Sequence, residues 1–147
     1  MYQDAAGVVV PRPPDAPAHD DVCVIIPVHN EGRVITEVVA SVRDVFPHVV
    51  CVDDGSSDGS AELASAAGAT VVRHPSNLGQ GAALQTGIDF ALRLPGIKVF
   101  VTFEADGQHQ VRDAVAMVAI AKRGEADVIL GSRFMGIGAS PMPRGRH

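Results

Sequence analysis

Polar residues that could bind a ligand follow four apolar, strand-like segments of the sequence. These segments end in "PVHNE", "VDDGSSDGS", "FEADGQH" and "GSRF". Carboxylate and amide oxygens are the ligands of hard divalent cations, and carboxylates also accept N–H groups of a nucleobase. A helix cap or a solvated turn would explain any one ending, but caps alone do not need doubled carboxylates. Together the endings indicate one ligand-binding edge of a sheet.

The segment "FEADGQH" is the strongest candidate for a cation site. Glu104, Asp106 and Gln108 are alternate residues, so in extended backbone their side chains share a face. Such a set suits Mg²⁺ or Mn²⁺, which also bind a ligand's phosphates. The alternative is a polar strand end that enters a turn. His109 is the histidine that stands beside this cluster.

Two other endings offer groups for a nucleoside. Asp53 and Asp54 leave a strand into a Gly-Ser turn, where a carboxylate could accept the ring N–H of uracil or guanine. Glu31 could accept ribose hydroxyls, or it could be an acid favoured by the dipole in the first turn of a helix. His29 could line the same pocket, and Asn30 is a candidate N-cap. We expect the other histidines, His19, His48, His74 and His147, at the surface.

The stretch "NLGQGAALQTG" does not follow the dinucleotide-binding pattern. Leu84 stands where the third glycine is required, and the stretch follows a loop instead of a strand. Asn77, Gly79 and Gly81 are explained by a tight loop that enters a helix near the ligand, or by ordinary loop chemistry.

Hydrophobic periodicity predicts alternating strands and helices. The expected strands are residues 22–28, 48–54, 69–74, 97–103 and 126–132, and the expected helices are within residues 30–46, 57–68, 81–94 and 111–124. This order is typical of an α/β domain with a mostly parallel sheet and helices on both faces. In such sheets ligands bind beyond the carboxyl ends of the strands.

Composition excludes several classes of protein. The 147 residues fit one domain, 46% are apolar, and the net charge of −5 argues against nonspecific binding to nucleic acid. Cys23 and Cys51 lie in apolar runs, as buried thiols do.

We expect a Pro-rich, weakly ordered arm at residues 1–20, the folded domain at 21–135, and a loop-like tail at 136–147. Without a signal-like start or an apolar run of about 20 residues, we expect a cytosolic chain that contacts a membrane only at its surface.

The motifs "VIIPVHNE", "VDDGSSDGS", "NLGQGAALQTGIDFAL", "FEADGQH" and "ILGSRF", in this order, resemble family 2 glycosyltransferases of the GT-A fold. The resemblance covers residues from about 22 to 135, and it is strongest to the branch of dolichyl-phosphate and polyprenyl-phosphate mannose synthases. It implies an inverting transferase that uses a UDP- or GDP-sugar donor, Mg²⁺ or Mn²⁺, and a lipid-phosphate acceptor at the cytoplasmic face of a membrane.

The resemblance also implies roles for individual residues. Those matching the base and ribose pocket are Pro27, His29, Asn30, Glu31, Asp53 and Asp54, with Gly79 in the neighbouring loop. Glu104, Asp106 and Gln108 match the metal-binding DxDxQ pattern, in which the cation bridges the protein and the donor diphosphate. Asp106 and Arg133 are the implied catalytic residues. Asp106 would hold the cation that stabilises the leaving group, and Arg133 matches an arginine that lies near phosphates of donor or acceptor.

Three departures from the family pattern affect these expectations. Glu104 stands where the pattern has Asp. Its longer side chain would push the carboxylate outward, so that it would bind the cation through a water molecule. Gln80 replaces a frequent Lys between the glycines, which removes a positive charge. The family's domain continues with strands and helices on the acceptor side, so this chain is expected to be the donor-binding half. A lipid phosphate is already ionised near neutral pH and needs no general base, whereas a sugar hydroxyl would need a carboxylate from a later segment.

Two other functions explain part of the pattern. A receiver-like module could use "VDD" to hold Mg²⁺, but it also requires a lysine and a hydroxyl residue at later strand ends, which Arg133 and Ser132 match poorly. A nucleotidyltransferase would require a Gly-rich, basic segment after the first strand, and "PVHNEGRVI" is not one.

Overall fold

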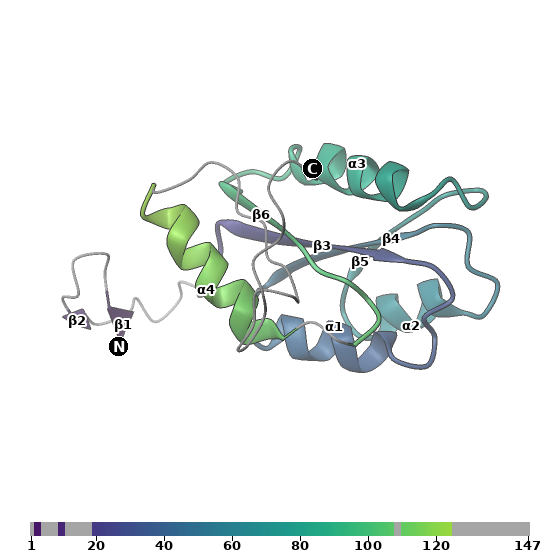
Figure 1. The fold of residues 1–147 in the computed structure, drawn as a ribbon, viewed down its shortest axis with the longest axis horizontal. Helices are drawn as coiled ribbons and strands as arrows, with labels where there is room; N and C mark the ends of the chain where they lie inside the picture. Colours follow the sequence, from purple (N-terminus) through teal and green to yellow (C-terminus); the bar gives the residue numbers. More distant parts are fainter. Residues whose placement is uncertain (1, 4–8, 11–18, 108–109, 125–147) are drawn as a thin grey trace, which may run out of the picture.

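A computed structural model describes residues 2–3, 9–10, 19–107 and 110–124 of the chain. Its main sheet has parallel strands in the order β5-β4-β3-β6, and a separate antiparallel pair joins β1 to β2 (Figure 1). The strands are β1 (Tyr2–Gln3), β2 (Val9–Val10), β3 (Val22–Val28), β4 (His48–Asp53), β5 (Thr70–Arg73) and β6 (Val99–Thr102). The helices are α1 (Ile35–Arg43), α2 (Ser60–Ala66), α3 (Gln80–Ala91) and α4 (Val111–Lys122). The predicted α/β class with a mostly parallel sheet is confirmed.

The central strand β3 is covered on both faces. Val24 and Ile26 belong to the apolar cluster on one face, and Cys23 and Ile25 belong to the cluster on the other. Successive side chains of a strand point to opposite faces, so a strand buried on both sides must be apolar at nearly every position. This explains the continuous apolar run of the sequence at residues 22–28.

The helices divide between the two faces of the sheet. α3 packs on the face of Ile25, and α1, α2 and α4 pack on the opposite face (Figure 1). Gly87 of α3 allows the closest approach, because a Cβ there would lie 2.4 Å from Cγ2 of Ile25. A side chain at this position would push α3 away from the sheet. The absence of a side chain at Gly87 therefore determines how closely α3 packs.

The start of α1 differs from the prediction. The helix begins at Ile35, and Asn30 does not cap it, since the N-cap position is Val34, which makes no side-chain capping hydrogen bond. Asn30 instead has a positive φ of 53°, and its Oδ1 accepts a hydrogen bond from the Ser57 N–H. The predicted N-cap role of Asn30 is wrong because a partner distant in sequence takes its side chain. Glu31 likewise precedes the regular helix, and its carbonyl accepts the Ile35 N–H.

Helix α2 lies within the range 57–68 expected from the sequence. Asp58 Oδ1 accepts the N–H of Ser60, the first helical residue, and Gly68 follows the helix with a φ of 108°. The predicted strand 126–132 lies outside the described residues, so it stays a prediction, as do the proposed domain limits. No helix in the described part of the chain has both the length and the apolar character needed to cross a membrane.

Candidate functional site

A pocket of about 300 Å³ lies at the carboxyl ends of β3, β4 and β6, beside the start of α3. It is lined by Pro27, Val28, His29, Glu31, Asp54, Asn77, Gln80, Ala83, Glu104 and Ala105. Parallel sheets bind ligands at this edge because the loops that follow the strands diverge there. The structure thus brings together three of the four polar strand endings found in the sequence, and the fourth, "GSRF", lies outside the described residues.

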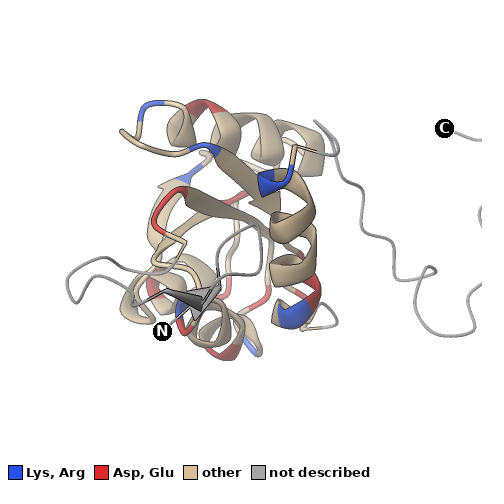
Figure 2. Cartoon of the chain, turned by 90° about the vertical axis from the view of Figure 1, so that its left-hand side faces the viewer, with Lys and Arg blue, Asp and Glu red and all other residues tan. Residues whose placement is uncertain are grey.

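The pocket is acidic. Glu31, Asp54 and Glu104 all line it, and none of the described residues that line it is Lys or Arg. Figure 2 shows Lys and Arg of the described part scattered over several helices and loops. An anionic ligand in this pocket would therefore need a cation to offset the repulsion between like charges.

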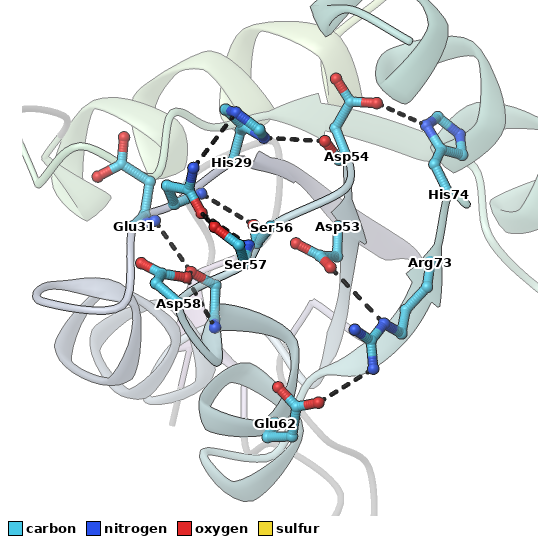
Figure 3. Close-up of polar contacts among 12 residues, drawn as sticks. His29, Glu31, Asp53, Asp54, Ser56, Ser57, Asp58, Glu62, Arg73 and His74 are labelled. Atoms are coloured by element: carbon cyan, nitrogen blue, oxygen red, sulfur yellow. Dashed lines mark hydrogen bonds and ion pairs between the residues drawn. The ribbon is translucent and has the colours of Figure 1, made fainter. Parts of the chain in front are cut away.

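His29 connects three loops around the pocket, and Figure 3 shows its contact with the Asp54 loop. Its Nδ1 lies 2.9 Å from the carbonyl oxygen of Asp54, so Nδ1 must carry the proton and donate. Its Nε2 lies 3.4 Å from Nδ2 of Asn30 and 3.3 Å from Nδ2 of Asn77. The Oδ1 atoms of these amides accept backbone N–H groups of Ser57 and Gly79, which assigns both amide orientations. Nε2 therefore acts as an acceptor, and the ring is held as the neutral Nδ1–H tautomer.

Asp54 holds the loop that leads into α3. Its carboxylate accepts hydrogen bonds from the backbone N–H groups of Leu78 and Gly79, each at 2.8 Å, and contacts Nδ1 of His74 at 2.8 Å. Burial alone would raise the pKa of this carboxyl, but these donors outweigh burial and lower the pKa below its ordinary value. The residue expected to bind a base is thus also the anchor of the pocket wall.

His74 is not the surface residue expected from the sequence. Its side chain is only 8% exposed, and its Nε2 lies 2.8 Å from Oγ1 of Thr86 in α3. The contact arises because β5 lies beside β4, which brings residues just beyond the ends of these neighbouring strands together. The sequence did place a histidine just after one strand and two aspartates at the end of another. The contact between them could be predicted only if these two strands were known to be neighbours in the sheet.

Asp53 points away from the pocket that Asp54 lines. The residue is 1% exposed, neither carboxylate oxygen has a hydrogen-bond partner among the described residues, and its ion-pair partner there is Arg73, whose Nε lies 3.7 Å away. Arg73 in turn bonds Glu62 at 3.0 Å (Figure 3). Asp53 and Asp54 are adjacent at a strand end, so their side chains take opposite sides. The structure therefore does not bring Asp53 into the pocket, and the charge of Arg73 is what offsets its burial.

The candidate cation residues follow β6. Glu104 is half-buried and lines the pocket, whereas Asp106 is half-buried and is not among the lining residues. The premise of an extended backbone is wrong beyond Glu104, because residues 105–106 form a turn and Gly107 has a φ of 81°. Within the described residues, no group of three or more His, Cys, Asp or Glu could hold a metal ion. Gln108, His109 and Arg133 lie outside the described residues.

The glycines of the pocket loops allow close backbone contacts. A Cβ at Gly55 would lie 2.6 Å from the backbone N of Asn77, and Gly55 has a φ of 77°. Gly79, with a φ of 102°, precedes α3 and gives its N–H to Asp54. Glycine is needed at both positions, because other residues rarely adopt these backbone angles. The two loops therefore meet backbone to backbone beside Asp54.

Comparison with known proteins finds relatives that include two enzymes named for lipid phosphates. The chain is 39% identical over 117 residues to "Uncharacterized protein MJ1222" of Methanocaldococcus jannaschii, covering 79% of this chain and 48% of that protein. It is 35% identical over 120 residues to the polyprenol monophosphomannose synthase of Mycolicibacterium smegmatis, covering 76% and 44%. It is 28% identical over 129 residues to the UDP-N-acetylglucosamine--dolichyl-phosphate N-acetylglucosaminyltransferase of Methanococcus voltae, covering 76% and 51%. The chain spans about half the length of these relatives.

A solved structure has the same fold as this chain, and a family model matches most of its sequence. The crystal structure of a mycobacterial protein shares the fold with a TM-score of 0.50 and 26% identity, over 59% of this chain and 31% of that chain. The model of "Glycosyl transferase family 2" matches residues 23–142, which include all the residues that line the pocket. The chain belongs to glycosyl transferase family 2.

Proposed function

We propose that this chain binds the nucleotide-sugar donor of an inverting, metal-dependent glycosyltransferase that acts on a polyprenyl or dolichyl phosphate. The family match supports glycosyl transfer, and it gives no support to a receiver-like module or a nucleotidyltransferase. The names of two relatives, one from a bacterium and one from an archaeon, include a lipid-phosphate product or acceptor. Such an acceptor implies peripheral contact with a membrane, on the cytoplasmic face in this proposal.

The acidic pocket is the observation that carries the proposal of metal dependence. A nucleoside diphosphate brings at least two negative charges to a pocket that already holds Glu31, Asp54 and Glu104 and that has no Lys or Arg among its described lining residues. At an effective dielectric constant of 20, two like charges about 4 Å apart repel by about 4 kcal/mol. A divalent cation would convert this repulsion into attraction.

The residue types after β6, two carboxylates and an amide, suit Mg²⁺ or Mn²⁺. Glu104 and Asp106 supply carboxylate oxygens on either side of Ala105, and the amide of Gln108 is the third proposed ligand. When bound, the cation would stabilise the negative charge that develops on the departing nucleoside diphosphate. Glu104 lines the pocket, so in this proposal the cation lies on that side of the donor.

The remaining roles belong to the chain's own side chains. We assign the base to Asp54 and His29, with Asn30 and Gly79 shaping that part of the pocket, and the ribose hydroxyls to Glu31. Pro27 and the neutral ring of His29 form an uncharged wall. Asp53 would act on the base only indirectly, since its side chain lies on the side of the strand end opposite the pocket. Arg133 stays assigned to the phosphates through the resemblance of its motif.

Isothermal titration of the chain with UDP and with GDP, each with and without Mn²⁺, tests donor binding. We expect one nucleotide to bind at least about tenfold more tightly with Mn²⁺, a difference of about 1.4 kcal/mol. The matching nucleoside monophosphate is the control, because the loss of one phosphate should remove most of the metal effect. If neither diphosphate shows metal-dependent binding to a sample that circular dichroism shows to be folded, the proposal is wrong.

A separate experiment tests the acceptor. The chain is incubated with the sugar derivative of the nucleotide that binds and with a short polyprenyl phosphate, and the lipid is analysed by mass spectrometry. Any transfer to the lipid should increase its mass by that of the transferred sugar. Transfer to an added sugar alcohol, with the lipid unchanged, would contradict a lipid-phosphate acceptor.

A further inference from the structure

The loop after β3 is attached to the loop before α2 by hydrogen bonds in both directions (Figure 3). The backbone N–H of Asn30 donates to Oγ of Ser56 at 2.8 Å, and Oδ1 of Asn30 accepts the Ser57 N–H at 2.9 Å. Asn30 holds a left-handed backbone conformation between these contacts, which asparagine tolerates better than most residues. The direction in which the chain leaves β3 is therefore set by the neighbouring loop.

The next two backbone N–H groups are also taken by that loop. Glu31 donates to Oγ of Ser60 at 2.9 Å, and Gly32 donates to Oδ2 of Asp58 at 2.9 Å. The Ser60 hydroxyl donates to Oδ1 of Asp58, and Ser60 is 0% exposed. A buried hydroxyl is thus satisfied both as a donor and as an acceptor, which makes its removal costly. Asp58 and Ser60 together fix the peptide groups on either side of Glu31.

The contact between Asp58 and Gly32 depends on the missing side chain. A Cβ at Gly32 would lie 3.0 Å from Oδ2 and 3.3 Å from Cγ of Asp58. Gly32 does not have a positive φ, so backbone conformation does not explain the glycine. The close approach of the two loops does explain it.

Asp58 also serves the helix that follows it, and the two roles use different oxygens. Oδ1 accepts the N–H of Ser60 at 3.0 Å, which is a contact at the start of α2. Oδ2 accepts the N–H of Gly32, a residue 26 positions earlier that belongs to the pocket loop. A residue needed only to start α2 would not require the second contact.

We propose that Asp58 is a positioning residue, which acts through the backbone of Glu31 and Gly32 to aim the Glu31 carboxylate into the pocket. Glu31 lines the pocket, whereas Asp58 is exposed and does not. The inference rests on the proposed function, because the aim of Glu31 matters only if the pocket takes the ribose of a nucleotide. It adds a residue whose effect on donor affinity passes through another side chain.

The Asp58→Asn variant separates the two roles. Its remaining carbonyl oxygen can still accept both donors of Ser60, while its NH₂ group faces the Gly32 N–H. We expect the thermal unfolding midpoint to change by only a few degrees and the affinity for the preferred nucleotide to fall about tenfold, since a displaced Glu31 would lose about one charge-assisted hydrogen bond to the ribose. Glu31→Ala should cost a similar factor, and the double variant should bind no worse than about twofold below Glu31→Ala.

Gly32→Ala is the second variant, because it leaves every polar group in place. Its methyl group should displace Asp58 and weaken nucleotide binding by about tenfold, as Asp58→Asn does. Glu62→Gln is the matched control: it neutralises an exposed acid of α2 that bonds Arg73 and does not line the pocket, and its affinity should stay within about twofold of the wild type.

The outcomes distinguish the inference from the function on which it rests. If the wild-type chain binds no nucleotide, both the proposed function and the inference fail. If the wild type binds and Asp58→Asn is within about twofold of it, or if the losses from Asp58→Asn and Glu31→Ala multiply, the positioning role is wrong and the proposed function stands.

Discussion

His74 and Asp54 face each other across the ends of two neighbouring strands, with Nδ1 2.8 Å from Oδ1 and side chains only 8% and 6% exposed. Asp54 extends this contact to the loop before α3, and His74 extends it to Thr86. The buried carboxylate is thereby surrounded by donors, which is the condition for keeping a charge inside a protein. The pocket wall and the fold share this group, so changes to it should affect both.

Acid should destabilise the fold through Asp54. The folded-state pKa of its carboxyl is lowered from the ordinary 3.8, because bonds from His74, Leu78 and Gly79 outweigh burial. A group with a lowered folded pKa contributes stability that is present above the unfolded pKa and is lost as the pH falls through the folded value. Urea unfolding measured from about pH 6 to about pH 3 should therefore show a steeper loss for the wild type than for Asp54→Asn. Parallel curves would contradict this role of Asp54.

Removal of the Thr86 hydroxyl should destabilise the chain. Thr86→Val keeps the shape of the side chain but leaves Nε2 of His74 without its partner. We expect a loss of about 1 kcal/mol in the free energy of unfolding, and a larger loss of about 1–3 kcal/mol for His74→Ala, which uncovers the Asp54 carboxylate. Thr86→Ser keeps the hydroxyl and is the control. Equal stability of the Val and Ser variants would show that the hydroxyl contributes nothing.

Gly87→Ala should weaken the packing of α3 on the sheet. The added methyl would lie 2.4 Å from Ile25, which is 0% exposed and cannot move aside freely. Overpacking of this kind typically costs about 1–3 kcal/mol, which chemical denaturation would measure. Gly81→Ala is the matched control in the same helix, because a Cβ there has no atom within 4 Å. That variant should be neutral or stabilising, since alanine favours helix more than glycine does.

The two candidate cation ligands after β6 should respond differently to substitution. Asp106→Ala should abolish the Mn²⁺-dependent part of nucleotide binding, whereas Glu104→Asp should preserve or tighten it, because Asp restores the family pattern. Titration of each variant with the preferred nucleotide, with and without Mn²⁺, measures the difference. Equal weakening by both substitutions would reverse our ranking of the ligands. A loss of Mn²⁺-dependent binding in the Glu104→Asp variant alone would also reverse it, and Glu104 is the one of the two that lines the pocket.

Much of the fold followed from local pattern. The apolar run at residues 22–28 predicted a strand, and helical spacing predicted α1 to α4, apart from their first and last residues. Asn30 shows where such reasoning stops. Its residue type and its place before a helix are those of an N-cap, yet its side chain bonds Ser57, which is 27 residues away. A local preference was overridden by a partner that the fold brings near.

The candidate site divides in the same way. The sequence by itself determined the order of strands and helices, the family and the polar strand endings, because these depend on residue type and on spacing within short segments. Only the tertiary structure decided that Asp54 turns to the pocket while Asp53 turns away, that His74 is buried beside Asp54, and that Asp58 reaches Gly32. These pairings join residues 20 or more positions apart, and they arise because parallel strands β3, β4 and β5 lie side by side with their carboxyl ends at one edge.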